Sequence, residues 1–357
     1  MSYDRAVRWN RKRSVPELCT AFANAVDNQD GRATTRILEE LAGAIPGAGP
    51  AVLTDGLRTI RPLLTQVPFG NGAVVATLVS ALIEAGANPS PVLDVVVDRV
   101  VDGLEQAARF PPLAGTRVAP PTDSATAQAV VTHVASAGRL GRDEASRVTQ
   151  AWFTVDDWIP ALLVPLQQKR ARQSLPQRRR LVDATAVAAE HIGNAEWLGG
   201  LLVVLDDEPI VVVHRESGAV FSVTISGIGD TFQLHTLLAH ALIDGGLVPG
   251  TPPHPSWVAA ATDGPLEPAT PIRGQFNLVD AAGAWIWNEG RPADIAPVAG
   301  RRVVVLDPPP YDRGWNVGRT YPLMLPELRL DGALAPAEAA RWRRVIAPAK
   351  PPDARRG

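Results

Sequence analysis

The spacing of the apolar residues changes near Trp197. Between Val15 and about Glu190 they recur three and four positions apart, which predicts helices that each bury one face. The clearest such stripe is Leu93, Val96, Val97, Val100, Val101 and Leu104. From Leu201 onward, short runs of Val, Leu and Ile alternate with turn-like segments, a pattern typical of strands. We therefore expect an all-α first half and a second half that contains a sheet.

The first half contains successive helical segments joined by short links. They lie near residues 15–28, 33–45, 50–65, 75–86, 93–104, 122–138, 142–153, 155–168 and 176–191. Helices joined by short links pack as antiparallel pairs, so this half is expected to be an irregular helical-repeat or bundle domain. It resembles HEAT-type helical pairs in architecture alone, because the sequence carries no convincing fixed repeat.

The second half contains strands, two helices and one long loop. Strands are predicted at Leu201–Leu205, Ile210–His214, Val220–Ser226, Gln275–Val279, Ala284–Trp287 and Arg302–Leu306. Helices are predicted from about Thr231 to Ile243 and over Pro336–Ile346. The Pro-rich segment Gly245–Gly274 is longer than an ordinary connector and is typical of a functional or mobile loop. Consecutive strands favour a mainly antiparallel or mixed sheet with helices on one face, so the overall class is α+β.

These patterns divide the chain into two domains. We expect a helical scaffold domain at 15–192 and an α+β domain at 198–348, with the division between Gly193 and Leu201. The 357 residues, 46% of them hydrophobic, are enough for a packed core in each. Residues 1–14 and 349–357 are polar or Pro-rich without periodicity, so both are expected to be flexible tails.

Charge and composition exclude several classes of partner. The net charge of −2 creates no overall field toward nucleic acid or anionic lipid. No apolar stretch reaches the ~18–20 residues that span a bilayer, and the basic first residues lack the apolar core of a secretory signal. We therefore expect a cytoplasmic protein without membrane contact. Abundant Ala, Val and Pro, with Arg as the main cation, is typical of high-GC bacterial coding.

Cys19 is the single cysteine of the chain, so an internal disulfide or a thiolate metal cluster is excluded. It lies on the apolar side of the first predicted helix, beside Leu18 and Phe22. This position favours a buried structural thiol over a nucleophile.

The turn from Ser226 to Asp230, with the sequence SGIGD, joins a predicted strand to a predicted helix. Such a turn can hold an anion through backbone N–H groups. The third glycine of a dinucleotide-binding fingerprint is replaced by Phe232, and an antiparallel neighbourhood lacks the parallel βαβ unit. A capping box formed by Asp230 and Gln233 explains both residues without a ligand. We therefore expect no cofactor.

Asp230, His235 and His240 are the candidate catalytic residues. The two histidines are separated by roughly 140° around a helix, so they do not ligate one metal from the same face, and we expect no metal site. His240 and Asp244 are four residues apart and can meet as a carboxylate-oriented imidazole or as an ordinary surface pair. No GxSxG motif surrounds Ser226, which argues against a serine nucleophile there.

Arg178, Arg179 and Arg180 form the densest basic segment of the chain, together with the nearby Lys169-Arg-Ala-Arg172. They are candidate contacts for an acidic partner or peptide. The alternative is a solvated helix end or an interdomain contact. Nucleic acid is disfavoured because the segment has no aromatic residues on which bases could stack.

Trp285 and Trp287 are two positions apart, which places both indoles on one face of a strand. Paired indoles can form a platform for a sugar or a peptide. The composition, with only 5% aromatic residues, favours a place in the core.

The segment Asp307–Tyr321 combines a stiff Pro-Pro-Pro turn with polar and aromatic side chains. Its candidate binding residues are Arg313, Trp315, Asn316, Arg319 and Tyr321. Such a composition in a loop is typical of a recognition surface, because the scaffold positions the groups while the loop exposes them. The alternative is a packed loop that covers the edge of the sheet.

The sequence therefore favours an accessory or adaptor protein that binds a protein or acidic peptide partner, rather than an enzyme. The alternative is an enzyme that acts on a small anionic substrate in the α+β domain, around Asp230, His235, His240, Arg313 and Arg319. A concave pocket that joins those side chains would favour the enzyme. Their dispersal would favour the adaptor.

Overall fold

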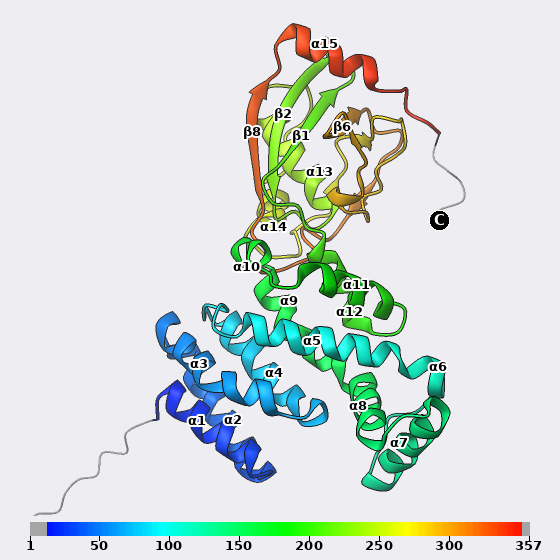
Figure 1. Ribbon diagram of the computed structural model, residues 1–357. Coiled ribbons are helices and arrows are strands. Elements are labelled where there is room, and N and C mark those ends of the chain that lie inside the picture. The colour runs from blue at the N-terminus through cyan, green and yellow to red at the C-terminus, as the bar shows by residue number, and fades with distance from the viewer. Residues whose placement is uncertain (1–12, 352–357) are drawn as a thin grey trace, which may run out of the picture. The chain divides into compact units, whose positions relative to one another are not determined.

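The computed structural model describes residues 13–351 and shows an α+β protein (Figure 1). Its residues fall into two compact units. One runs through Pro165 and includes Gln173–Gly199, and the other joins Leu166–Arg172 to the chain from Gly200 onward. Most of the predicted tails lies outside the described residues, although Ser14 is the N-cap of the first helix. Within the described chain, no helix is both long and apolar enough to span a bilayer.

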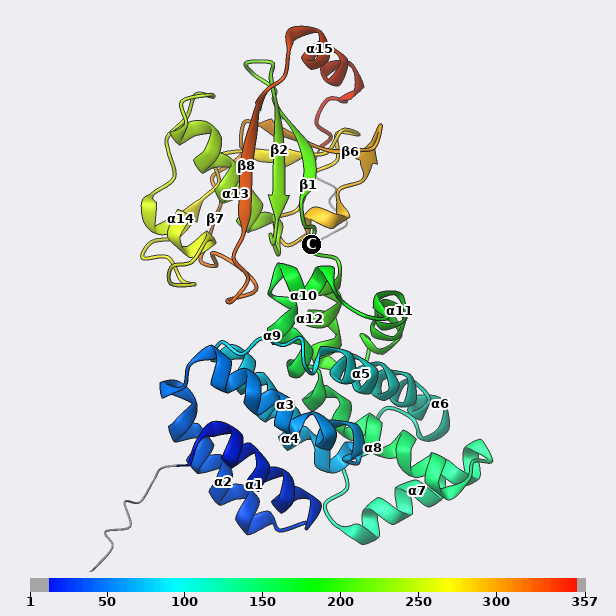
Figure 2. The ribbon, with the colours of Figure 1, turned by 60° about the vertical axis from the view of Figure 1, so that its left-hand side comes forward.

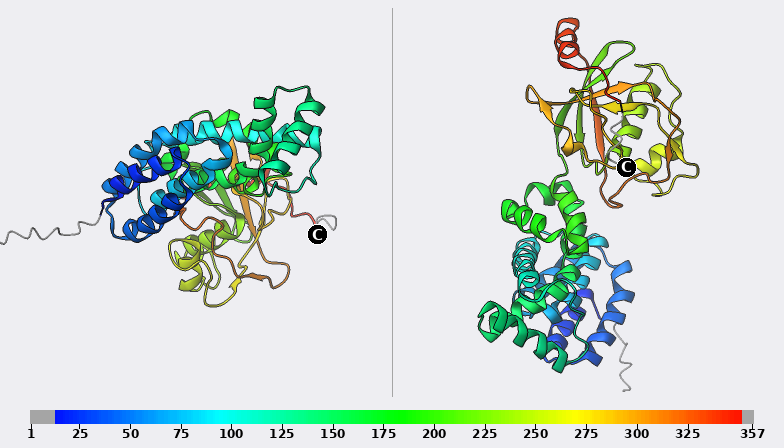
Figure 3. Two further views of the ribbon diagram at one scale, coloured as in Figure 1. Left: turned by 90° about the horizontal axis from the view of Figure 1, so that it is seen from below. Right: turned by 90° about the vertical axis from the view of Figure 1, so that its right-hand side faces the viewer.

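The part of the chain before Val203 is helical (Figures 2 and 3). Its helices are α1 (Val15–Asp27), α2 (Gly31–Ala44), α3 (Pro50–Gln66), α4 (Phe69–Glu84), α5 (Leu93–Ala108), α6 (Phe110–Ala114), α7 (Ser124–Gly138), α8 (Arg142–Trp158), α9 (Pro160–Leu166), α10 (Lys169–Gln173), α11 (Arg178–Ala188) and α12 (Gly193–Leu202), with a short 3-10 turn at Ile45–Gly47. The predicted apolar stripe of α5 is buried along its whole length.

Helix packing in this part is not confined to neighbours in the sequence. α1 packs against α2 and α3, whereas α8 packs against α4, α5 and α7. In a solenoid each repeat contacts only the adjacent repeats. The contacts of α8 therefore favour a bundle over a linear stack of helical pairs.

The strand predicted at Leu201–Leu205 is wrong. Ala195, Leu198, Leu201 and Leu202 are buried at helical spacing, and α12 continues to Leu202. A short apolar run does not distinguish a buried strand from a buried helix by periodicity alone. The first strand begins only at Glu208, and the change of pattern near Trp197 lies inside a helix.

The second unit contains a mixed sheet of six strands (Figure 2). Its strands are β1 (Glu208–His214), β2 (Ala219–Ser226), β4 (Asn277–Val279), β5 (Pro297–Val298), β6 (Arg301–Asp307) and β8 (Glu327–Ala333). The order is β4-β6-β1-β2-β8, with β5 paired to β6. β1 and β6 are parallel, and the other pairs are antiparallel. A separate ribbon pairs β3 (Ile272–Arg273) with β7 (Gly314–Trp315).

Each face of the sheet is covered by a helix. Ile210 and Val212 of β1 belong to one core with α13 (Thr231–Ala239). Val211 and Val213, which alternate with them, belong to a second core with α15 (Pro336–Val345). Because successive side chains of a strand point to opposite faces, the expectation of helices on one face only is wrong.

The second unit departs from the sequence predictions in three further places. β8 was not predicted, because Leu328 and Leu330 are the only apolar residues that alternate before a glycine. Ala284–Trp287 forms only a bridge between Trp285 and Val279. The long Pro-rich segment contains α14 (Pro255–Ala261), a helix capped by the side chain of His254.

Close packing between α4 and α8 gives a test of the helical fold. A Cβ at Gly72 would lie 2.0 Å from Cζ2 of the fully buried Trp158, whereas a Cβ at Gly70 of the same helix would make only an ordinary contact, 3.9 Å from Gln150 Oε1. We expect Gly72→Ala to lower the free energy of unfolding by about 1–3 kcal/mol through overpacking, measured by urea denaturation. The control Gly70→Ala should leave it unchanged or raise it slightly. Equal effects of the two substitutions would contradict this packing.

Candidate functional site

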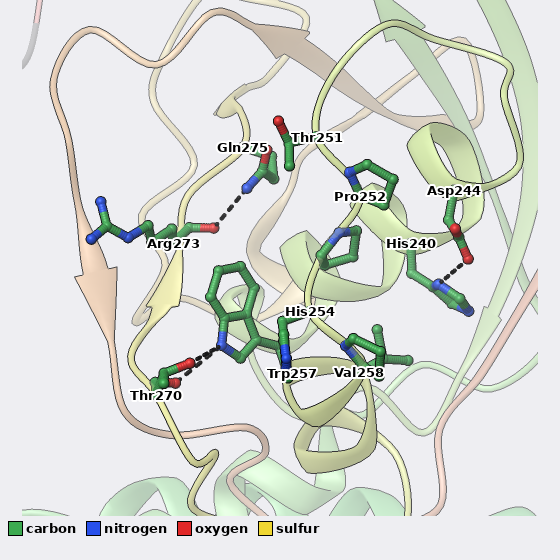
Figure 4. Close-up of a pocket in the computed structure, with 12 residues that line it drawn as sticks. His240, Asp244, Thr251, Pro252, His254, Trp257, Val258, Thr270, Arg273 and Gln275 are labelled. Atoms are coloured by element: carbon green, nitrogen blue, oxygen red, sulfur yellow. Dashed lines mark hydrogen bonds and ion pairs between the residues drawn. The ribbon is translucent and has the colours of Figure 1, made fainter.

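A large pocket lies within the second unit, beside α13 and α14 (Figure 4). Its volume is about 790 Å³. It is lined by His240, Asp244, Thr251, Pro252, Pro253, His254, Pro255, Trp257, Val258, Thr270, Arg273 and Gln275. Most of these residues come from the Pro-rich segment. The pocket end formed by His240 and Asp244 is a single π-helical turn, a distortion found frequently at functional sites.

A fixed indole forms one wall of the pocket. The Nε1 group of Trp257 donates to the carbonyl oxygen and to the hydroxyl of Thr270, both at 3.0 Å. These bonds fix the orientation of the half-buried ring, which lines the pocket. Pro252 and the other prolines line the same space, and the amide of Gln275 lies across it from the ring (Figure 4).

The other end of the pocket carries an imidazole paired with a carboxylate. His240 Nδ1 lies 3.3 Å from Asp244 Oδ2, which confirms that these two residues meet. Both side chains are about half exposed. The second histidine of the lining, His254, is a helix cap whose Nδ1 accepts from the Ser256 amide at 3.2 Å. Only His240 among the three candidate catalytic residues therefore lines the pocket.

His235 is sealed inside the protein. Its Nε2 accepts two backbone N–H groups, those of Gln275 and Phe276, each at 3.0 Å. Burial, and then the nearby positive charge of Arg313, lower the pKa of His235 to about 3. The imidazole is therefore neutral at physiological pH, and it acts as an acceptor that holds the pocket wall against α13.

Asp230 is also a buried helix cap. It accepts from the Gln233 amide at 2.7 Å and from the Thr320 hydroxyl, and burial raises the pKa of its carboxyl group. The predicted capping box is formed only in part, because the Gln233 side chain accepts from Gly229 N at 2.9 Å and donates to the carbonyl of Ala261 at 2.8 Å. Gln233 thereby joins α13 to α14.

The SGIGD turn is covered by the chain itself. A Cβ at Gly229 would lie 2.9 Å from the ring of Tyr321, and one at Gly227 would lie 2.8 Å from the Leu325 carbonyl oxygen. The first two amides of α13 are already bonded within the chain, since those of Thr231 and Phe232 donate to the carbonyls of Gly290 and Asn288, at 2.9 and 3.0 Å.

The Asp307–Tyr321 loop is mostly anchored inward. Arg319 is buried and donates to the carbonyls of Ala260 and Pro322, at 2.7 and 3.1 Å. Tyr321 is also buried, and the half-buried Arg313 donates to the Phe276 carbonyl at 2.6 Å. These three side chains support the loop and have little surface for a partner.

The two remaining candidate binding residues of this loop are Trp315 and Asn316. Trp315 is half-buried and packs against Phe232 and, edge to face, against His235, with ring centroids 5.1 and 5.2 Å apart. Asn316 is exposed. The Asp307–Tyr321 loop therefore resembles the alternative, a packed loop, more than an open recognition surface. Only some of its side chains are exposed.

The basic segment is divided between the units, because Arg178, Arg179 and Arg180 belong to the helical unit and residues 169–172 to the second unit. Arg178, Arg179 and Arg180 form the first turn of α11. Arg180 makes two hydrogen bonds to Glu105, at 2.5 and 2.7 Å, and this pair neutralises part of the local charge. Since both partners are largely exposed, the pair adds little to stability.

The single thiol lies in the helical unit. Cys19 is fully buried, as predicted, and burial raises the pKa of its thiol to about 12. Among residues 13–351, no three His, Cys, Asp or Glu side chains come together as metal ligands. The pocket residues that sequence reasoning missed include Thr251, His254, Trp257, Val258, Thr270, Arg273 and Gln275. Their only signal was the unusual length of the Pro-rich segment.

No protein-family model, curated protein or solved structure matches this chain.

The buried imidazole of His235 predicts a specific dependence of stability on pH. Its pKa is about 3 in the folded chain and ~6.5 when unfolded, so the unfolded chain binds the extra proton between these values. The stability is fully present above pH ~6.5 and falls as the pH drops toward 3. Between pH 7 and pH 5, the wild type should lose about 2 kcal/mol more than His235→Gln.

Urea denaturation at the two pH values measures this difference. Gln is chosen because its side-chain oxygen can still accept an N–H group, although the variant should be less stable at pH 7. Identical pH slopes for the two proteins would show that His235 is not neutral and buried.

Proposed function

We propose that this chain is an accessory protein of the bacterial cytosol whose second unit binds a peptide segment of a partner protein. The pocket beside Trp257 would take an apolar side chain of that segment, and the helical part would serve as scaffold. The observation that carries the proposal is a fixed, half-buried indole in a proline-lined pocket of about 790 Å³. Ligand sites are typically concave, mostly apolar and about 300–1,000 Å³ in size.

The lining chemistry suits a peptide. Trp257 and the three prolines provide rigid apolar surface that loses little conformational entropy on binding. Within residues 13–351, the side-chain amide of Gln275 makes only a long contact of 3.5 Å, to the Arg273 carbonyl. It is therefore available to bond a peptide backbone in the pocket.

An acidic residue next to the apolar side chain of the peptide could pair with a cation at the rim of the pocket. Arg273 is exposed, and its side chain extends away from Trp257 in Figure 4. No ion pair of its guanidinium is present within residues 13–351, whereas Asp244 is already paired with His240. A partner carboxylate would therefore bind Arg273 without competing with a carboxylate of the chain.

The alternative function is an enzyme that acts on a small anionic substrate. It is favoured by one observation, the imidazole of His240 oriented by Asp244 at the pocket end. Asp230, His235 and Arg319 do not support it, because they are buried and hydrogen bonded to the chain itself. Dispersal of these candidates favours the binding protein.

Selection from a displayed peptide library on the full-length chain tests the proposal. We expect enrichment of peptides that share an apolar anchor next to an acidic residue. Trp257→Ala should weaken a selected peptide by about 2 kcal/mol or more, roughly 30-fold in Kd, because an aromatic anchor in a pocket dominates binding energy. Arg273→Gln should give a smaller loss that disappears at high salt.

Trp197→Ala is the matched control, since Trp197 is 51% exposed and lies outside the pocket. It should leave the Kd unchanged, and circular dichroism should show that each variant is folded. His240→Gln should change the Kd by less than about threefold. Selected peptides that bind Trp257→Ala as well as the wild type would refute the proposal.

A further inference from the structure

The chain after α15 is held on the surface of the second unit by a repeating set of hydrogen bonds. The amide of Ala347 donates to the carbonyl of Ala281, and the amide of Lys350 donates to the carbonyl of Gly283, both at 2.8 Å. In the opposite direction, Arg215 Nη2 donates to the Ala347 carbonyl at 3.1 Å. The Trp285 indole donates to the Lys350 carbonyl at 2.9 Å.

The bonded residues of this tail are three positions apart. Ala347 and Lys350 each use both backbone groups, and Pro348 and Pro351 give the tail the spacing Pro-x-x-Pro. A polyproline II helix has three residues per turn, so every third backbone group faces the same side. The preceding residue, Ile346, is already extended, with φ −89° and ψ 131°.

The receiving surface is shaped for close approach of a backbone. Gly283 has φ +82°, and a Cβ at this position would lie 2.1 Å from the Pro348 carbonyl oxygen. Only glycine therefore admits the tail here. Because the hydrogen bonds to the tail use its backbone atoms, the surface recognises an extended shape rather than particular side chains.

Aromatic residues surround the indole that holds the tail. The ring centroid of Trp285 lies 6.0 Å from that of Trp287 and 6.4 Å from that of Tyr311, which is 53% exposed. On the other side, Asp307 pairs with Arg215 and so orients the guanidinium toward the tail. Aromatic grooves with an indole N–H donor are the usual receptors for Pro-x-x-Pro segments.

The tail itself is weakly attached. Pro348, Ala349, Lys350 and Pro351 are all exposed, so little apolar area is buried with them. Segments with few buried contacts open at low free-energy cost. The tail is therefore held on this surface mainly by hydrogen bonds to its backbone.

We propose that the surface formed by Gly283, Trp285 and Arg215 is a docking site for a Pro-x-x-Pro segment of a partner protein, and that the tail covers it in cis. The seated tail identifies the chemistry of the occupant, because a partner segment with the same spacing would make the same backbone bonds. The site is separate from the Trp257 pocket and does not depend on the function proposed for it.

A full-length chain with a released tail tests the proposal. Ala347→Pro with Lys350→Pro removes the two tail N–H donors, and the extended Ile346 is compatible with a following proline. The probe is a labelled peptide of residues 346–357, titrated by fluorescence anisotropy. We expect the released chain to bind it at least tenfold more tightly than the wild type, whose tail competes at millimolar effective concentration.

Substitutions of Trp285 and Trp257 distinguish peptide binding at the docking surface from peptide binding in the Trp257 pocket. In the released chain, Trp285→Phe should weaken the peptide at least tenfold, because phenylalanine lacks the N–H donor. Trp257→Phe should leave it unchanged. A peptide with alanine at positions 348 and 351 should bind at least tenfold more weakly.

A folded released chain that does not bind the peptide, or binds it independently of Trp285, would overturn the proposal. So would a wild-type dimer that the tail substitutions abolish, since the docking surface would then bind the tail of a second copy. If the released chain does not fold, hydrogen exchange on the wild type provides the test. Millimolar peptide should accelerate exchange of the Ala347 and Lys350 amides, and unchanged exchange would contradict the proposal.

Discussion

The pocket of the second unit depends on buried polar side chains that project from α13. His235 accepts two N–H groups from the strand side of the pocket, and Gln233 donates to the end of α14 on the other side. A buried polar group that loses its partner costs about 1–3 kcal/mol, so each of these bonds strongly constrains the loop that it holds. The space beside Trp257 exists because the two walls are fixed to one helix.

The protonation of His235 follows from the same bonds. Its Nε2 accepts two hydrogens, so the ring proton must be on Nδ1, a buried atom without a hydrogen-bond partner in the described chain. The ring stands nearly perpendicular to that of Trp315, at 88°. Trp315 therefore packs edge to face with the imidazole that anchors α13.

The sequence predicted the elements with strong periodicity and missed those that depend on tertiary contacts. The stripe of α5 and the strands β1, β2 and β6 follow directly from apolar spacing. The run after Leu201 was misassigned because α12 and a buried strand share the same composition. Three strands were missed because they are too short or too polar to give a clear pattern, namely β3, β7 and β8. Pairing with neighbouring strands stabilises them more than the β-propensity of their own residues does.

The candidate site shows the same division. Asp230 and His235 are titratable groups near the SGIGD turn, which made them candidate catalytic residues. In the structure both are buried and have structural roles. The relevant signal was the length of the Pro-rich segment, which does not reveal that Trp257 and Gln275 face one space. Likewise, the contact between residues 281–285 and the tail joins segments more than sixty positions apart, which no local pattern predicts.

The most direct test of the central claim is amide hydrogen exchange on the full-length chain, with and without a saturating selected peptide. If the peptide binds in the Trp257 pocket, amides of residues 251–275 should be newly protected from exchange, and those of residues 307–321 should change little. Protection confined to residues 307–321, or none within the second unit, would contradict it.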